Sequence, residues 1–184
     1  MSFINEAFLE SASTESRYFR PAPKKPNKVR ILSERPTLGH LQWTEDGKPV
    51  RWPYNGSKPQ ANFQADSKPR KFMACAVWNY ETESVQVWEI TQKSIMDALA
   101  TITNDPDFGH PNNFDLKITR TGEGLDTQYG VIPISSPLDP NLEPLLANPG
   151  VNLEALFEGE DPFARPNANS KAYGYQLTFG RSCR

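Results

Sequence analysis

The order of the β-rich segments constrains the fold of this chain more than any other feature of its sequence. Lys71–Tyr80 and Val85–Ile90 are rich in β-branched and aromatic residues, and the turn-forming sequence Glu-Thr-Glu-Ser between them predicts a hairpin. Residues 114–120 alternate between apolar and polar side chains and, with Gln128–Ile134, predict a second hairpin. Between the two hairpins, Gln92–Ile102 has apolar residues at helical spacing and predicts a helix.

Three shorter strands are predicted upstream, at Val29–Leu32, Leu38–Trp43 and Val50–Trp52. Thr91 directly precedes the predicted helix, where a Thr side chain is able to cap the helix N-terminus. This order predicts a mainly β protein, an OB-fold-like five-stranded Greek-key barrel with one helix. An α+β sheet with one covering helix fits the pattern nearly as well.

The composition divides the chain into three parts. Residues 1–27 form a basic, Pro-rich arm, residues 28–135 the predicted domain, and residues 136–184 an acidic, Pro-rich segment with a short aromatic end. Tyr173–Phe179 has aromatic and apolar residues at alternate positions, which favours one more strand. Extended segments are therefore expected on both sides of the domain.

Charge is sorted along the chain, although the formal net charge is only −2. Arg17–Lys71 contains thirteen Lys or Arg and four Asp or Glu, whereas Thr121–Ala164 contains eight acids and no base. Such a basic block favours a polyanion, because each phosphate contact releases condensed counterions. Aromatic residues lie among these bases, and flat rings stack nucleobases. The block therefore predicts binding of single-stranded nucleic acid.

The candidate DNA-binding residues fall into phosphate contacts and stacking rings. The expected phosphate contacts are Arg30, Arg51, Lys68, Arg70 and Lys71, and the bases that would close the groove from the second hairpin are Lys117 and Arg120. The flexible arm would add Arg17, Arg20, Lys24 and Lys25. The candidate stacking rings are Trp52 and Tyr54, which lie in a polar loop. Trp43 either stacks a base or belongs to the core, and Tyr129 is a secondary candidate for stacking. Trp78 and Trp88 are expected in the core.

The sequence gives little support for an enzyme or a metal site. His40, His110, Cys75 and Cys183 show no metal-ligand spacing, and neither histidine lies in a catalytic motif. A third hypothesis is a metal-dependent nuclease that uses the acids in and just after a turn-rich loop, Asp105, Asp107 and Asp115. The favoured interpretation is a non-enzyme that needs no cofactor. No apolar run approaches the roughly 20 residues that span a bilayer, so no membrane contact is expected, and the location expected is a reducing host cytoplasm.

Four segments resemble phage single-stranded DNA-binding proteins, a family related to the T4-type helix-destabilising protein. These segments are KVRIL at Lys28–Leu32, VWNY at Val77–Tyr80, VQVWEITQKS at Val85–Ser94, and FDLKITRTGEGLDTQYGVIP at Phe114–Pro133. The resemblance covers residues 17–135 and is strongest over 70–134. Its most specific part is an ordered run of residues, Asp115, Ile118, Arg120, Gly122, Gly124, Thr127 and Tyr129.

The resemblance implies an OB-fold that coats single-stranded DNA in phage replication and recombination, without sequence preference. Many relatives carry a Cys-rich zinc module, which Trp52–Pro69 lacks. The alternative function is a scaffold that recruits replication or recombination proteins through Asp139–Phe163. A segment of this composition is also compatible with a linker that only keeps the protein in solution. The sequence leaves the oligomeric state open between a monomer and a weak dimer.

Overall fold

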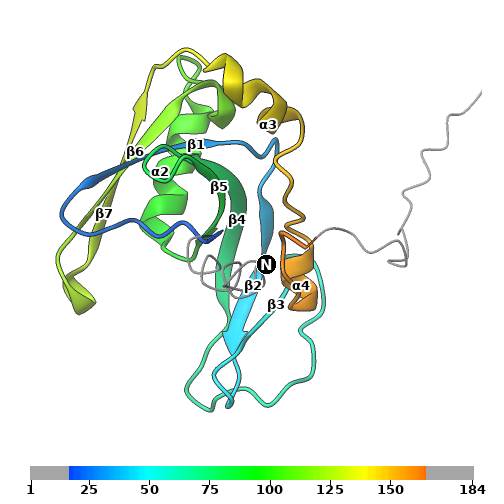
Figure 1. Cartoon of the computed structure of the whole chain (residues 1–184). Coiled ribbons are helices and arrows are strands. Elements are labelled where there is room, and N and C mark those ends of the chain that lie inside the picture. Colours follow the sequence, from blue (N-terminus) through cyan, green and yellow to red (C-terminus); the bar gives the residue numbers. More distant parts are fainter. Residues whose placement is uncertain (1–16, 165–184) are drawn as a thin grey trace, which may run out of the picture.

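The computed structural model describes residues 17–164, which form a mainly β structure around one antiparallel sheet (Figure 1). The first part of the predicted arm and the predicted strand Tyr173–Phe179 lie outside the described residues. Within residues 17–164, none of the helices has the length and apolar character needed to cross a bilayer. The mainly β class predicted from the sequence is therefore confirmed.

Seven strands and three α-helices make up the described chain. The strands are β1 (Pro26–Ile31), β2 (Thr37–Trp43), β3 (Pro49–Pro53), β4 (Arg70–Asn79), β5 (Ser84–Ile90), β6 (Asp115–Thr121) and β7 (Gln128–Ile134). The helices are α2 (Lys93–Asn104), α3 (Glu143–Ala147) and α4 (Ala155–Glu158). Short 3₁₀ turns occupy Pro111–Asn113, Gly124–Asp126 and Pro140–Leu142.

The long strand β4 is the centre of the sheet. Strand β5 pairs along one edge of β4, while β1 and β2 pair one after the other along its opposite edge. The sheet therefore branches: β6 and β7 continue from β1, and β3 continues from β2. The seven segments predicted as strands within residues 17–164 are strands, but they form a seven-stranded sheet where a five-stranded barrel was expected.

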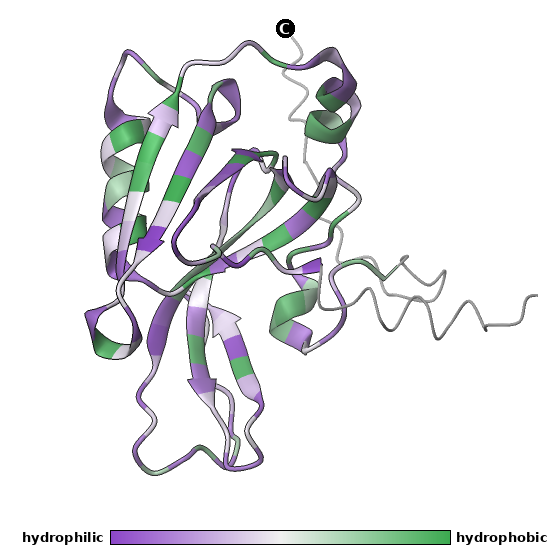
Figure 2. Ribbon diagram, turned by 60° about the vertical axis from the view of Figure 1, so that its left-hand side comes forward, coloured by the Kyte–Doolittle hydropathy of each residue, from purple (hydrophilic) through white to green (hydrophobic). Residues whose placement is uncertain are grey.

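Helix α2 covers one face of the sheet and closes the main core. Its buried residues Ile95, Leu99 and Ile102 pack with sheet residues that include Val29 and Trp88. Figure 2 shows hydrophobic and hydrophilic positions alternating along the strands, as a sheet with one face toward this core requires. Trp88 lies in the core as expected, whereas Trp78 is only half-buried and does not belong to the core clusters. The predicted cap was wrong, because the helix begins after Gln92 and no side chain caps it.

The acidic segment packs on the opposite face of the sheet, beside β2 and β3 (Figure 1). Leu156 is buried there against Leu41 and Phe72, and the Phe157 ring lies 6.0 Å from the Phe72 ring. Gly39 makes this approach possible, because a Cβ atom on it would lie 2.8 Å from the Phe157 ring. Residues 136–164 are therefore a folded part of the structure where an extended segment was expected.

Part of the predicted basic arm also joins the sheet. Tyr18 forms a parallel bridge with Val87, and the backbone N–H of Phe19 donates to the Val87 carbonyl at 2.8 Å. The Phe19 ring meets Trp88 edge-on, with centroids 5.4 Å apart. These contacts fix Arg17 and Arg20 beside β5.

Candidate nucleic-acid interface

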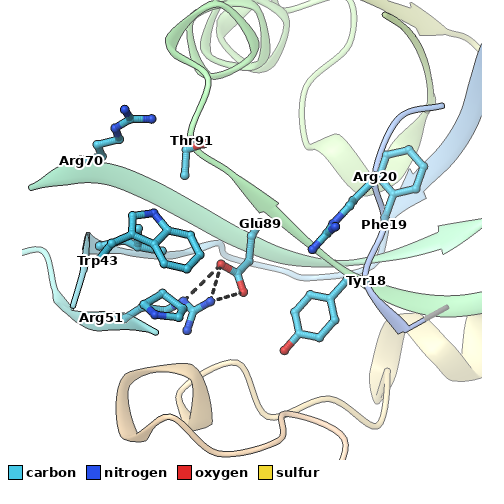
Figure 3. Close-up of a pocket in the computed structure, with 10 residues that line it drawn as sticks. Tyr18, Phe19, Arg20, Trp43, Arg51, Arg70, Glu89 and Thr91 are labelled. Carbon is cyan, nitrogen blue, oxygen red and sulfur yellow. Dashed lines mark hydrogen bonds and ion pairs between the residues drawn. The ribbon is translucent and has the colours of Figure 1, made fainter. Parts of the chain in front are cut away.

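A groove with a volume of about 430 Å³ opens where β2, β3, β4 and β5 lie side by side (Figure 3). It lies on the face of the sheet opposite α2. In Figure 3 the Glu89 side chain lies between Trp43 and Arg51 on one side and Tyr18 and Arg20 on the other. The groove is lined by Tyr18, Phe19, Arg20, Leu41, Trp43, Pro49, Arg51, Arg70, Glu89 and Thr91.

Strand register explains why these residues meet. Leu41 pairs with Arg51 on β3 and with Arg70 on β4, so both arginines lie on the same face as Leu41. Trp43 follows two residues later on β2 and therefore shares that face. Three of the residues predicted from the sequence, Trp43, Arg51 and Arg70, are thus brought together in one groove.

One ion pair spans the groove from β3 to β5. The Arg51 guanidinium donates to both carboxylate oxygens of Glu89, with Nη2 at 2.9 and 3.0 Å and Nε at 3.2 Å. Two strands separate β3 from β5, and neighbouring strands lie about 4.8 Å apart. The two long side chains therefore reach toward each other over β2 and β4, across the groove.

The groove carries an excess of positive charge. Its lining has three arginines and one acid, Glu89. Within residues 17–164, neither Arg20 nor Arg70 pairs with an acid, so their guanidinium groups are open to an incoming anion. Burial, followed by the charge of Glu89, raises the pKa of Tyr18, whose hydroxyl group therefore stays neutral at physiological pH.

Trp43 is the exposed tryptophan of the groove, with 43% of its surface accessible. Trp52 was predicted to stack a base, but it is only 6% exposed, so this prediction is corrected. Its ring is stacked on His40 at 5.6 Å and lies against Phe63 at 6.4 Å. Trp43, left undecided by the sequence, is the ring that the structure offers to a ligand.

A second aromatic surface lies on the opposite face of the β2–β3 hairpin. Tyr54 is half-exposed there and stacks on His40, with ring centroids 5.4 Å apart. The Lys71 ammonium lies 5.5 Å from the Tyr54 ring centroid. Tyr54 and Lys71, both predicted site residues, are therefore neighbours, but the sheet separates them from the groove. Sequence analysis missed His40, which joins them.

Arg30 was predicted to contact phosphate, and the structure corrects this prediction. Its side chain is fully buried, with Nε 2.6 Å from Asp115 and Nη2 donating to the Ser136 carbonyl at 2.8 Å. Lys28 pairs with the other Asp115 oxygen at 2.9 Å, and the Tyr80 hydroxyl donates to Asp115 at 2.9 Å. Burial and then the bond to Asp115 raise the pKa of Tyr80 to about 12. Arg30 and Asp115 form the fully buried centre of this ionic cluster, with Lys28 and Tyr80 at its edge, so Arg30 is not accessible to a phosphate.

The ionic cluster predicts a stability that falls on acidification. Burial alone would raise the pKa of Asp115, but hydrogen bonds from Lys28, Arg30 and Tyr80 outweigh it and hold that pKa below its ordinary value of 3.8. The stabilisation is therefore fully present above pH 3.8 and is lost as the pH falls through the lower pKa of the folded state. Urea unfolding between pH 6 and 2 should show this loss, and it should be smaller in Asp115→Asn.

The remaining predicted residues lie apart from the groove. Lys68 is exposed in the loop before β4. Lys117 and Arg120 are three residues apart on β6, so they lie on opposite faces of that strand. Tyr129 is half-buried against the α2 core, opposite Arg120. The second hairpin therefore does not close this groove.

The acids proposed for a nuclease do not form a metal site. Asp115 is held by the ionic cluster, and the described residues contain no group of three or more His, Cys, Asp or Glu able to hold a metal ion. Cys75 is buried, and burial raises the pKa of its thiol to about 12. Comparison with protein-family models, curated proteins and solved structures finds no match to this chain. The site must therefore be interpreted from its own geometry.

Proposed function

We propose that the protein binds single-stranded DNA without sequence preference in the groove between β2, β3, β4 and β5. The observation that carries the proposal is that an exposed tryptophan and three arginines line the same concave surface. The arginines would hold phosphates along the backbone, and Trp43 would stack one base. A duplex keeps its bases stacked inside, so only a single strand offers an unstacked base to this ring.

The work proposed for the protein is the protection of single-stranded template during phage replication and recombination in the host cytoplasm. The segments that resemble phage single-stranded DNA-binding proteins support this role, and they support an OB-like ancestry of the sheet. The antiparallel sheet with α2 between β5 and β6 is compatible with that ancestry. Such binding involves no covalent chemistry and no cofactor.

A titration of the protein with oligo-dT tests the function. The three arginines that line the groove, Arg20, Arg51 and Arg70, would contribute about 0.7 each to the slope of log affinity against log salt. Between about 50 and 300 mM salt, three such contacts lower affinity by roughly fortyfold. Tryptophan fluorescence should be quenched on binding, because Trp43 is exposed. Absence of binding at both salt concentrations would refute the proposal.

The acidic segment supports a second candidate function, the recruitment of replication or recombination proteins. Its apolar residues Leu156 and Phe157 face the sheet, whereas Glu158 and Glu160 are exposed. This arrangement presents acids to a basic partner without unfolding the segment. Capture of a partner that survives high salt and requires residues 139–163 would favour this function over DNA coating.

A further inference from the structure

Glu89 is the acid in a groove whose other charged residues are all arginines. The alternation of Val85, Val87 and Glu89 places its side chain on the groove face of β5, opposite Trp88. Both partners of its ion pair with Arg51 are largely shielded from solvent, with side-chain exposures of 17% for Glu89 and 14% for Arg51. The pair is therefore a stable feature of the free protein.

We propose that Glu89 occupies, on Arg51, the position that a DNA phosphate takes in the complex. This inference rests on the proposed function. The planar guanidinium group of arginine binds carboxylates and phosphates with the same two-pronged geometry. Glu89 already uses that geometry, since Arg51 contacts both of its carboxylate oxygens. A bound strand therefore replaces an internal anion, and Glu89 is a determinant of affinity.

The two unpaired arginines decide how this exchange begins. Arg20 and Arg70 line the groove without an acid partner in residues 17–164, so phosphates reach them first. The strand held there brings the next phosphate to Arg51, where it must displace Glu89. Because Glu89 must be displaced, the contact between Arg51 and a phosphate adds less binding free energy than an unpaired arginine would add. The bound strand therefore dissociates more readily.

Substitution of Glu89 by Gln tests the exchange. Glu89→Gln keeps the shape of the side chain and removes the competing charge, so affinity for oligo-dT should rise about tenfold. Glu45→Gln is the matched control, because it removes the same charge from an exposed residue on the turn of the β2–β3 hairpin that does not line the groove. A general charge effect would change both variants alike.

A double variant tests whether the effect passes through Arg51. Arg51→Met/Glu89→Gln removes both charges of the pair, so neither partner is left without its counter-charge. Because Arg51 contacts a phosphate in the proposed complex, the double variant should lose about 0.7 of the log–log salt slope relative to wild type. The double variant is compared with wild type, so the test holds even if the single variant Glu89→Gln does not fold. An unchanged salt slope would overturn the inference. Thermal unfolding by circular dichroism verifies the fold of each variant.

The outcomes separate this inference from the proposed function. If wild type fails to bind oligo-dT, both are wrong. If wild type binds but Glu89→Gln binds no tighter than Glu45→Gln, only the exchange is wrong. Weaker binding of folded Glu89→Gln would show that Glu89 instead positions Arg51 for the strand, and would also overturn the exchange.

Discussion

Asp115→Asn is expected to lower the free energy of unfolding by about 3–5 kcal/mol, the cost of leaving a buried charge without its partner. The residue left behind is Arg30, whose side chain is fully buried and whose Nε lies 2.6 Å from Asp115. The Ser136 carbonyl is its one other hydrogen-bond partner in the described structure, and a neutral carbonyl does not balance the charge. Thermal unfolding should show the midpoint falling by about 10 °C.

Two further variants separate the ion pair from simple loss of packing. Lys28→Met should have a much smaller effect, because the Lys28 side chain is 43% exposed and its charge is partly solvated. Arg30→Met/Asp115→Leu replaces both buried charges and should recover much of the stability lost in Asp115→Asn. If the double variant is as unstable as the single one, the cluster contributes through shape and not through charge pairing.

The sequence located the strands well, but it could not show which residues cover them. In KVRIL, alternation places Val29 and Ile31 toward one face and Arg30 toward the other, so Arg30 resembled a surface base. That face is covered by Asp115 and Ser136, both more than eighty residues away along the chain. A contact of this range depends on the pairing of β1 with β6, which no local pattern reveals.

Alternation also divides the predicted site between two faces of the sheet. Arg51 and Trp52 are neighbours on β3, and Arg70 and Lys71 are neighbours on β4, so each pair points to opposite sides. Treating Trp52 as a loop residue hid this division. Alternation also places Glu89 on the groove face of β5, but its contact with Arg51 depends on the order of β3, β2, β4 and β5 in the sheet, which no local pattern reveals.

Trp43→Ala is expected to weaken oligo-dT binding by about 1–3 kcal/mol, or roughly 5- to 150-fold, the usual value of one base stacked on an aromatic ring. Trp43 is the exposed tryptophan among the three arginines of the groove, so its substitution removes the largest ring that is open for stacking there. The fluorescence quench should largely disappear as well, because Trp52 and Trp88 are buried and the half-buried Trp78 does not line the groove. The salt dependence should be unchanged, since the substitution removes no charge.

Tyr54→Ala is the matched control for this substitution. Tyr54 has an exposed fraction of 50%, close to the 43% of Trp43, and belongs to the same hairpin region but lies on the opposite face of the sheet. A strand in the groove cannot reach it, so Tyr54→Ala should bind oligo-dT within about twofold of wild type. If Tyr54→Ala is the weaker binder of the two, the strand follows the surface formed by His40, Tyr54 and Lys71. The arginines of the groove would then serve another anion.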